Sequence, residues 1–300
     1  MFPNRKVFRV FPRKTKATPD DQNVRINCAP GLFDEADEIH ISVTFSWDLP
    51  CAEKLAWEWS VVAPIKIGGP ATGEKSGDFI PGMYLKKGYV ITSRGCPNHC
   101  WFCSVPKREG NIRELPITEG WNVLDDNLLA CSDKHIKAVF AMLAKQKEPV
   151  EFTGGLEAAR LTPRIAEELK KLRIKQMFFA YDTPDDLPPL IEAGRLLQDA
   201  GFALQPCSHA LRCFVLCGFK GDTIAKGETR MEETMQAGFT PMAMLWKDET
   251  GKSEPEWRKF QRMWARPAII YSKGRYTGDL GRVYTKGCRY AAVSGVVSTY

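Results

Sequence analysis

The chain has 300 residues, of which 44% are hydrophobic and 26% are charged, a balance that suits one large globular domain or two modest ones. No apolar run approaches the length needed to cross a bilayer, and the basic N-terminal stretch lacks the continuous apolar core of a signal peptide. We therefore expect a cytoplasmic protein with no membrane partner, whose ten cysteines are unpaired thiols in a reducing compartment.

Residues 1–88 are predicted to form a small α/β region that ends in a linker. Pro50 suits the first turn of a helix, where its missing N–H is not needed. The expected order of elements is β-α-β, which indicates a small parallel sheet. The strands are expected at 7–11, 39–45 and 64–67, the helix at 50–59, and a linker rich in Gly and Lys at 71–88.

Residues 89–250 alternate strands with helices. Each helix has an apolar stripe at helical spacing. Either Ser132 or Asp133 is positioned to cap the first helix, and Thr162 is positioned to cap the second. Alternation of this kind predicts a parallel sheet with right-handed crossovers, curled into an open, partial barrel. The strands are expected at 89–93, 150–153, 176–181, 211–216 and 241–246, and the helices from 132, 162, 186 and 224. Residues 104–127 are expected to be irregular, with Asp125-Asp126-Asn127 in turn and capping roles.

Three cysteines, Cys96, Cys100 and Cys103, lie within eight residues at offsets of four and three. This spacing is too tight for a disulfide framework and suits a loop around one metal cluster, because thiolates are soft ligands of iron–sulfur clusters and of zinc. The loop supplies three ligands, and the next cysteine, Cys131, lies far along the chain. A cluster held by three thiolates leaves one iron open, which is what a catalytic metal needs.

The pattern Cys-x3-Cys-x2-Cys, with Phe102 before the last cysteine, resembles the cluster loop of the radical S-adenosylmethionine (SAM) superfamily. The resemblance covers about residues 89–247. It implies a partial β/α barrel, a 4Fe–4S cluster on the three cysteines, SAM bound to the open iron, and reductive cleavage of SAM to a 5′-deoxyadenosyl radical. It also implies an external electron donor similar to flavodoxin or ferredoxin.

The resemblance further implies SAM contacts close to the cluster loop and after the second strand. Phe102 would shield the cluster, and its backbone would approach the adenine. Gly154-Gly155 resembles the Gly-Gly-Glu element that contacts the methionyl amino group of SAM, although Leu156 stands where Glu is usual and Glu157 would have to replace it.

Two further candidates follow the third and fourth predicted strands, at the sheet edge where parallel barrels place their chemistry. Asp182 is suited to bind a ribose or a substrate hydroxyl, and a helix-capping role is equally open. Gly218 belongs to a turn that resembles one near adenosine in the family. Asp222 and Thr223 in that turn are expected to start the next helix instead.

The N-terminal region resembles a shortened cobalamin-binding domain. Those domains carry Asp-x-His-x-x-Gly, whereas the stretch around His40 has neither the Asp nor the Gly. We therefore do not expect cobalamin to be bound through a histidine. We expect His40 to be a strand residue with a hydrogen-bond partner.

The C-terminal extension, residues 251–300, is basic. From residue 255 onward it holds nine Lys or Arg against Glu256 and Asp279. A solvated tail is the favoured interpretation, and contact with nucleic acid is the alternative. Cys207, Cys213 and Cys217 form a second, looser group, which we interpret as mainly apolar filler rather than an auxiliary metal site.

The sequence therefore predicts a radical SAM enzyme that acts on an unknown substrate, with methyl transfer, rearrangement and nucleotide modification all open. The alternative is a zinc-dependent nucleic-acid-binding module that uses the same cysteines with His99 or His135 and the basic tail. A third interpretation keeps the fold but gives the cluster only a structural role.

Overall fold

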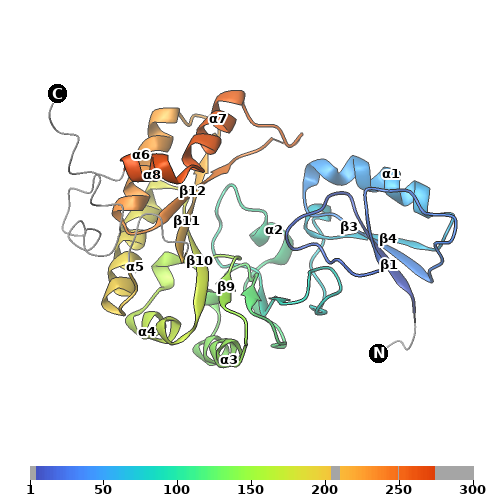
Figure 1. The fold of residues 1–300 in the computed structure, drawn as a ribbon, viewed down its shortest axis with the longest axis horizontal. Coiled ribbons are helices and arrows are strands. Elements are labelled where there is room, and N and C mark those ends of the chain that lie inside the picture. Colours follow the sequence, from blue (N-terminus) through green and yellow to red (C-terminus); the bar gives the residue numbers. More distant parts are fainter. Residues whose placement is uncertain (1–4, 204–209, 249, 274–300) are drawn as a thin grey trace. The chain divides into compact units, whose positions relative to one another are not determined.

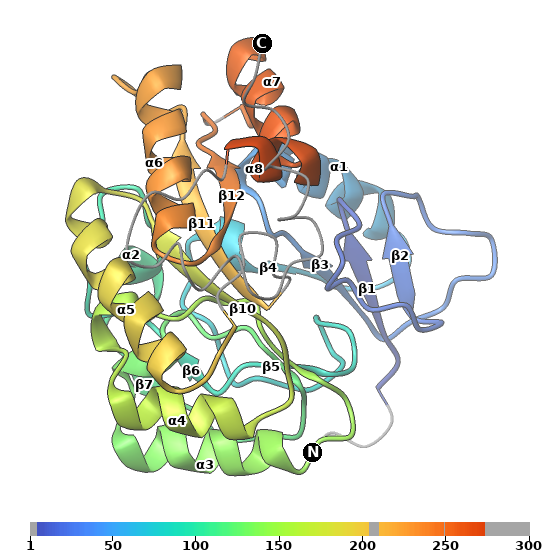
Figure 2. The ribbon, with the colours of Figure 1, turned by 60° about the vertical axis from the view of Figure 1, so that its left-hand side comes forward.

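The computed structural model describes residues 5–203, 210–248 and 250–273, and it is an α/β protein built on parallel sheets (Figures 1 and 2). One sheet has four strands, a second has six, and β6 and β7 form a two-stranded ribbon; the strands described do not close into a barrel. Contacts divide the chain after Asn127 into two units, and Thr250 and Gly251 belong to the first. The predicted boundary after residue 88 thus falls inside the first unit.

The four-stranded sheet lies in the first unit and has the order β2-β1-β3-β4, with every neighbouring pair parallel. Its members are β1 (Val7–Phe11), β2 (Val24–Ile26), β3 (Glu38–Ser42) and β4 (Ile65–Gly68). The predicted parallel β-α-β arrangement is confirmed. Strand β2 was not expected, because three residues are too few to show an alternating pattern.

Helix α1 (Leu49–Trp59) packs against this sheet and supplies three of the eight buried residues of a small core. Ala52, Leu55 and Trp59 recur at helical spacing and are fully buried. The indole N–H of Trp59 donates a 2.8 Å hydrogen bond to the carbonyl of Cys28, which satisfies the buried polar end of the largest core side chain. The strands contribute Phe8, Val10, Ile39 and Ile41, and Val43 follows β3 directly.

The rest of the first unit contains short elements. β5 (Tyr89–Val90) pairs in parallel with β8 (Asn122–Val123), and β6 (Ser93–Arg94) pairs in antiparallel fashion with β7 (Arg113–Glu114). The predicted strand at 89–93 is therefore split in two. The segment 104–127, expected to be irregular, holds α2 (Val105–Glu109), β7 and β8.

The second unit contains four parallel strands in the order β12-β11-β10-β9. Helices connect them, and Figure 1 shows α4, α5 and α6 on the same side of these strands. The strands are β9 (Val150–Phe152), β10 (Ile174–Tyr181), β11 (Leu211–Cys217) and β12 (Thr240–Leu245). The helices are α3 (Asp133–Ala144), α4 (Pro163–Lys171), α5 (Leu187–Asp199), α6 (Ile224–Gln236), α7 (Pro255–Trp264) and α8 (Pro267–Lys273).

Side-chain caps fix the starts of three of these helices. The hydroxyls of Ser132, Thr162 and Thr223 accept the backbone N–H three residues later, as predicted for all three positions. Helix α5 buries Leu190, Leu196 and Leu197, whereas Ile191 is exposed. Among the described residues, no helix combines the length and apolar character that crossing a membrane requires.

Gly194 in α5 allows a close approach of backbone to backbone. A Cβ there would lie 2.1 Å from the carbonyl oxygen of Ala237, which cannot move without shifting the end of α6. Gly194→Ala gains about 1 kcal/mol of helix propensity, but overpacking costs about 1–3 kcal/mol.

We expect Gly194→Ala to lower the free energy of unfolding by about 1 kcal/mol net in urea denaturation. Gly77→Ala is the control, because a Cβ there meets no atom within 4 Å. It should change the free energy of unfolding by less than about 0.5 kcal/mol. Equal stability of Gly194→Ala and the parent chain would contradict the packing argument.

Candidate functional site: the cysteine loop

The loop that carries the three cysteines is closed at its base. β6 and β7 pair at Ser93 with Glu114 and at Arg94 with Arg113, and the backbone N–H of Cys96 donates to the carbonyl of Gly110 at 3.1 Å. Gly95 has φ +90°, and a Cβ there would lie 2.2 Å from the carbonyl oxygen of Asn111. Only glycine lets the two sides of this neck approach so closely. Residues 96–110 therefore form a closed loop.

The three cysteines of this loop form no disulfide and lie at different depths. Cys100 is exposed, whereas Cys96 and Cys103 are partly buried. The side-chain amide N–H of Asn127 donates to Sγ of Cys96 at 3.3 Å. Burial raises the pKa of the Cys103 thiol, and the backbone N–H of Val105 opposes this only in part. Without a metal, Cys103 therefore stays protonated at neutral pH.

The donor set suits a metal cluster by its chemistry. Three soft ligands lie on one closed loop, and an amide N–H is bonded to one of the sulfurs, as is common around cluster thiolates. In the part of the chain that the structure describes, no three His, Cys, Asp or Glu side chains converge on a point that would hold a metal ion. The structure thus shows the order of the three thiols along the loop and the residues that support them.

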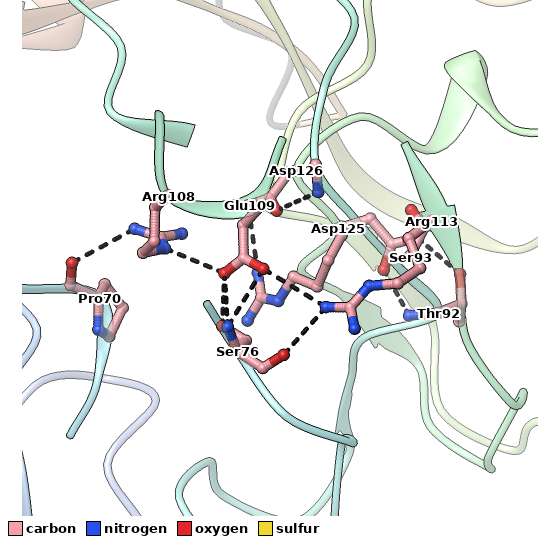
Figure 3. Close-up of polar contacts among 11 residues, drawn as sticks. Pro70, Ser76, Thr92, Ser93, Arg108, Glu109, Arg113, Asp125 and Asp126 are labelled. Atoms are coloured by element: carbon pink, nitrogen blue, oxygen red, sulfur yellow. Dashed lines mark hydrogen bonds and ion pairs between the residues drawn. The ribbon is translucent and has the colours of Figure 1, made fainter. Parts of the chain in front are cut away.

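Asp125 anchors the strand that leads into the loop. Its carboxylate accepts the backbone N–H of Thr92 at 2.6 Å, the hydroxyl of Thr92 at 2.6 Å and the hydroxyl of Ser93 at 2.7 Å (Figure 3). The residue is 2% exposed. Burial raises the pKa of Asp125, and the three hydrogen bonds act in the opposite direction. A buried carboxyl group with three donors fixes the backbone that it accepts from.

The two residues after Asp125, Asp126 and Asn127, contact the next residues of the segment that leads into the loop. Asp126 accepts the backbone N–H of Gly95 at 2.9 Å and forms an ion pair with Arg94 at 3.2 Å. Asn127 then bonds Cys96. Three consecutive residues, which we call the Asp-Asp-Asn clamp (125–127), thus hold five consecutive residues, 92–96. The predicted turn and capping roles of this triplet are wrong, because its partners lie about 30 residues away and β8, which places it, was not recognised.

Glu109, at the end of α2, anchors the other end of the loop. Its side chain is fully buried and accepts the hydroxyl of Ser76 at 2.5 Å and Nε of Arg108 at 3.0 Å (Figure 3). Burial would raise the pKa of Glu109, but the bonds from Ser76 and Arg108 outweigh it, and the pKa lies below the usual range. Arg108 and Arg113 also donate to the carbonyls of Pro70 and Ser76. Nothing in the local sequence marked Glu109 as a buried ion.

The predicted Gly-Gly element follows β9 in the second unit. Gly155 has φ +97°, which an L side chain rarely adopts, and Glu157 pairs with Arg160 at 2.6 Å. Leu156 is buried, and its N–H donates to the carbonyl of Phe178 at 2.7 Å, so its side chain belongs to the core. The Gly-Gly element was expected after the second strand. Because β8 lies between β5 and β9, the element follows the third parallel strand instead.

Asp182 follows β10 and is 8% exposed. It accepts the backbone N–H of Leu216 at 3.2 Å and does not cap the next helix, since Thr183 and Asp186 form that capping box. Burial and, second, the charge of Asp186 raise the pKa of Asp182 to about 7. Asp182 therefore changes charge near neutral pH.

Gly218 follows β11, and its lack of a side chain has a packing explanation. It has φ +78°, and a Cβ there would lie 2.9 Å from the ring of Trp257 on α7. Asp222 accepts the N–H of Gly218 at 2.9 Å and pairs with Arg230 at 2.7 Å, while Thr223 caps α6 as expected. These contacts account for the turn without a ligand.

Within the second unit, the predicted SAM contacts share one edge. Gly154-Gly155, Asp182 and Gly218 follow β9, β10 and β11, which are neighbouring parallel strands and so end on the same side of the sheet. The three cysteines and Phe102 belong to the first unit. The ring of Phe102 is partly buried and lies edge-to-face with the exposed Trp101 at 5.3 Å.

The four other groups singled out in the sequence have simple surroundings. His40 is a strand residue whose ring nitrogens contact Tyr84 and Glu38 at 2.7 and 2.8 Å, as expected. Cys213 and Cys217 are buried in β11, which confirms the apolar-filler interpretation for these two, and Cys207 lies outside the described residues. His99 is exposed and His135 is buried in α3. Most of the basic tail, 274–300, also lies outside the described residues.

Comparison with protein-family models gives no match for this chain, and comparison with curated proteins gives none either. The assignment of a function therefore depends on the residues and contacts described above.

Asp125→Ala should strongly destabilise the first unit. It removes the acceptor of three hydrogen bonds and leaves the buried donors of Thr92 and Ser93 unpaired. We expect a loss of about 3 kcal/mol in the free energy of unfolding, together with faster hydrogen exchange at the Thr92 amide. Asp133→Ala, at a mostly exposed side chain, is the control and should cost less than about 1 kcal/mol. Slow exchange at Thr92 in Asp125→Ala would contradict the anchoring role.

Asp182 should make stability depend on pH between about 4 and 7. Its pKa is raised from 3.8 to about 7 on folding, so its contribution is fully present below pH 3.8 and is lost as the pH rises through 7. The shift corresponds to at most about 4 kcal/mol. Asp182→Asn keeps an acceptor for Leu216 and should remove this decline, so that the variant is the more stable protein above pH 7. Parallel stability curves for variant and parent in urea would disprove the assignment.

Proposed function

We propose that this protein is a radical SAM enzyme that binds a 4Fe–4S cluster through Cys96, Cys100 and Cys103 and acts on an unknown substrate. The observation that carries the proposal is the closed loop on which three cysteines, none in a disulfide, lie between two anchored ends. A structural zinc site normally has four protein ligands. A loop with three ligands suits a cluster that keeps one coordination position open.

When bound, the cluster would supply an electron and an open coordination position for SAM. The residues of this chain then have distinct roles in the proposal. The three thiolates hold the cluster, the partly buried ring of Phe102 keeps water from one side of the loop, and the exposed Cys100 and Trp101 leave another side accessible. A flavodoxin- or ferredoxin-like protein is the proposed source of electrons.

The proposal extends to the second unit. There we propose that the strands belong to a partial barrel and that the edge formed by Gly154-Gly155, Asp182 and Gly218 faces SAM or the substrate. The backbone near Gly155 is open, because a Cβ on it would meet no atom closer than 4.0 Å. Asp182 has a pKa of about 7, so it can hold or accept a proton at a substrate hydroxyl near neutral pH. Gly218 adds least support to the proposal, because packing against the ring of Trp257 already explains why this position is a glycine.

Anaerobic reconstitution with iron and sulfide, followed by reductant and SAM, tests the proposal. We expect a brown protein that absorbs near roughly 400 nm and forms 5′-deoxyadenosine, or S-adenosylhomocysteine if the reaction is methyl transfer. Cys100→Ala should lose the cluster and both products. Cys28→Ala, a change at another exposed free thiol, should keep them.

Three results would count against the proposal. Full iron content in Cys100→Ala would show that Cys100 does not hold the cluster and that the cysteine loop is not the cluster site. A colourless parent protein with one bound zinc would favour the zinc-dependent nucleic-acid-binding alternative. A stable cluster that never cleaves SAM after reduction would favour a structural role.

A further inference from the structure

We propose that Asn127 is a positioning residue for Cys96 and that its amide N–H raises the reduction potential of the cluster held by the cysteine loop. This inference rests on the proposed function, because it concerns the metal group assigned to that loop. It adds to the site a residue that lies outside the cysteine motif. It also concerns the reduction potential of the cluster, which the motif alone does not set.

The contact itself is buried and specific. The amide nitrogen of Asn127 lies 3.3 Å from Sγ of Cys96, within hydrogen-bond distance for sulfur, and Asn127 is 4% exposed. A side-chain amide offers N–H donors on one arm only, and a thiolate can only accept, so the N–H arm must face the sulfur. With little water near the donor, the bond to a charged sulfur is stronger than it would be in solution.

The rest of the clamp holds this donor in place. The carboxylates of Asp125 and Asp126, the two residues before Asn127, accept the backbone N–H groups of Thr92 and Gly95. On the other side, the backbone N–H of Cys96 is bonded to Gly110. The residues that carry the donor and the sulfur are thus both held by hydrogen bonds before any metal binds. A donor fixed in advance costs no reorganisation when charge appears on its acceptor.

The effect on the potential follows from where the added charge goes. Reduction by one electron makes the cluster and its thiolates more negative, and an N–H donor to a ligand sulfur stabilises the more negative state. Removal of the donor should therefore disfavour the reduced state. We expect about a tenfold smaller equilibrium constant for electron uptake, which is about 59 mV for a one-electron couple.

Two variants and one control test this in the full-length reconstituted protein. Asn127→Leu removes the donor at similar size, and Asn127→Asp keeps the shape but places a carboxylate beside the sulfur. Asn111→Leu, in the exposed part of the neck, is the control. Iron and sulfide per chain report assembly, and a redox titration followed by electron paramagnetic resonance reports the midpoint potential.

We expect full iron content in at least one Asn127 variant, a potential lowered by about 59 mV in Asn127→Leu, a larger decrease in Asn127→Asp, and no change in Asn111→Leu. Unchanged potentials in loaded Asn127 variants would overturn the inference and leave the proposed function intact. Loss of iron from both folded variants would also overturn it, because Asn127 would then serve assembly only. A parent protein that assembles no cluster would refute the proposed function itself.

Discussion

The cysteine loop depends on a buried carboxylate. Asp125 accepts both the backbone N–H and the hydroxyl of Thr92, and this fixes the strand from which the loop departs. Burying such a group is costly unless its donors are supplied by the protein, and here three donors are supplied within two residues. Asp126 and Asn127 extend the same contact to Gly95 and Cys96. The position of the first cysteine is therefore set by a segment about 30 residues later in the chain.

A second buried acid, Glu109, anchors the other end of the loop. Glu109 is ionised and is surrounded by Arg108, Arg113 and Ser76, so the helix that leaves the loop is bound to residues 70–76. Between these two anchored ends lies the turn that carries the thiols. Ligands on such a turn can adjust around a metal while the residues that support them stay fixed, as a site needs when its metal is added after folding.

The sequence predicted the regular parts well and missed the short ones. Helices α3, α4 and α6 were recognisable because an apolar stripe and a capping hydroxyl coincide at Ser132, Thr162 and Thr223. Strands β2, β7 and β8 have two or three residues each, too few to show a period.

Because β8 was missed, the strand count before Gly154 was wrong and the Asp-Asp-Asn clamp had no predicted position. Spacing identified the three thiols, which are local in the chain. Their supports are not local, and so they could be found only in the fold.

The clamp also bears on which changes in chain length the loop tolerates. Residues 92–96 meet residues 125–127 in order, so each clamp residue bonds its own one or two neighbouring residues of the strand. A single deletion inside either segment would displace every later donor from its acceptor at once. Extra residues beside the exposed Ser104, between Cys103 and α2, would leave the match intact, because the neck between Cys96 and Gly110 closes beneath them. Homologous chains can therefore differ in length within the loop but not within the two segments that support it.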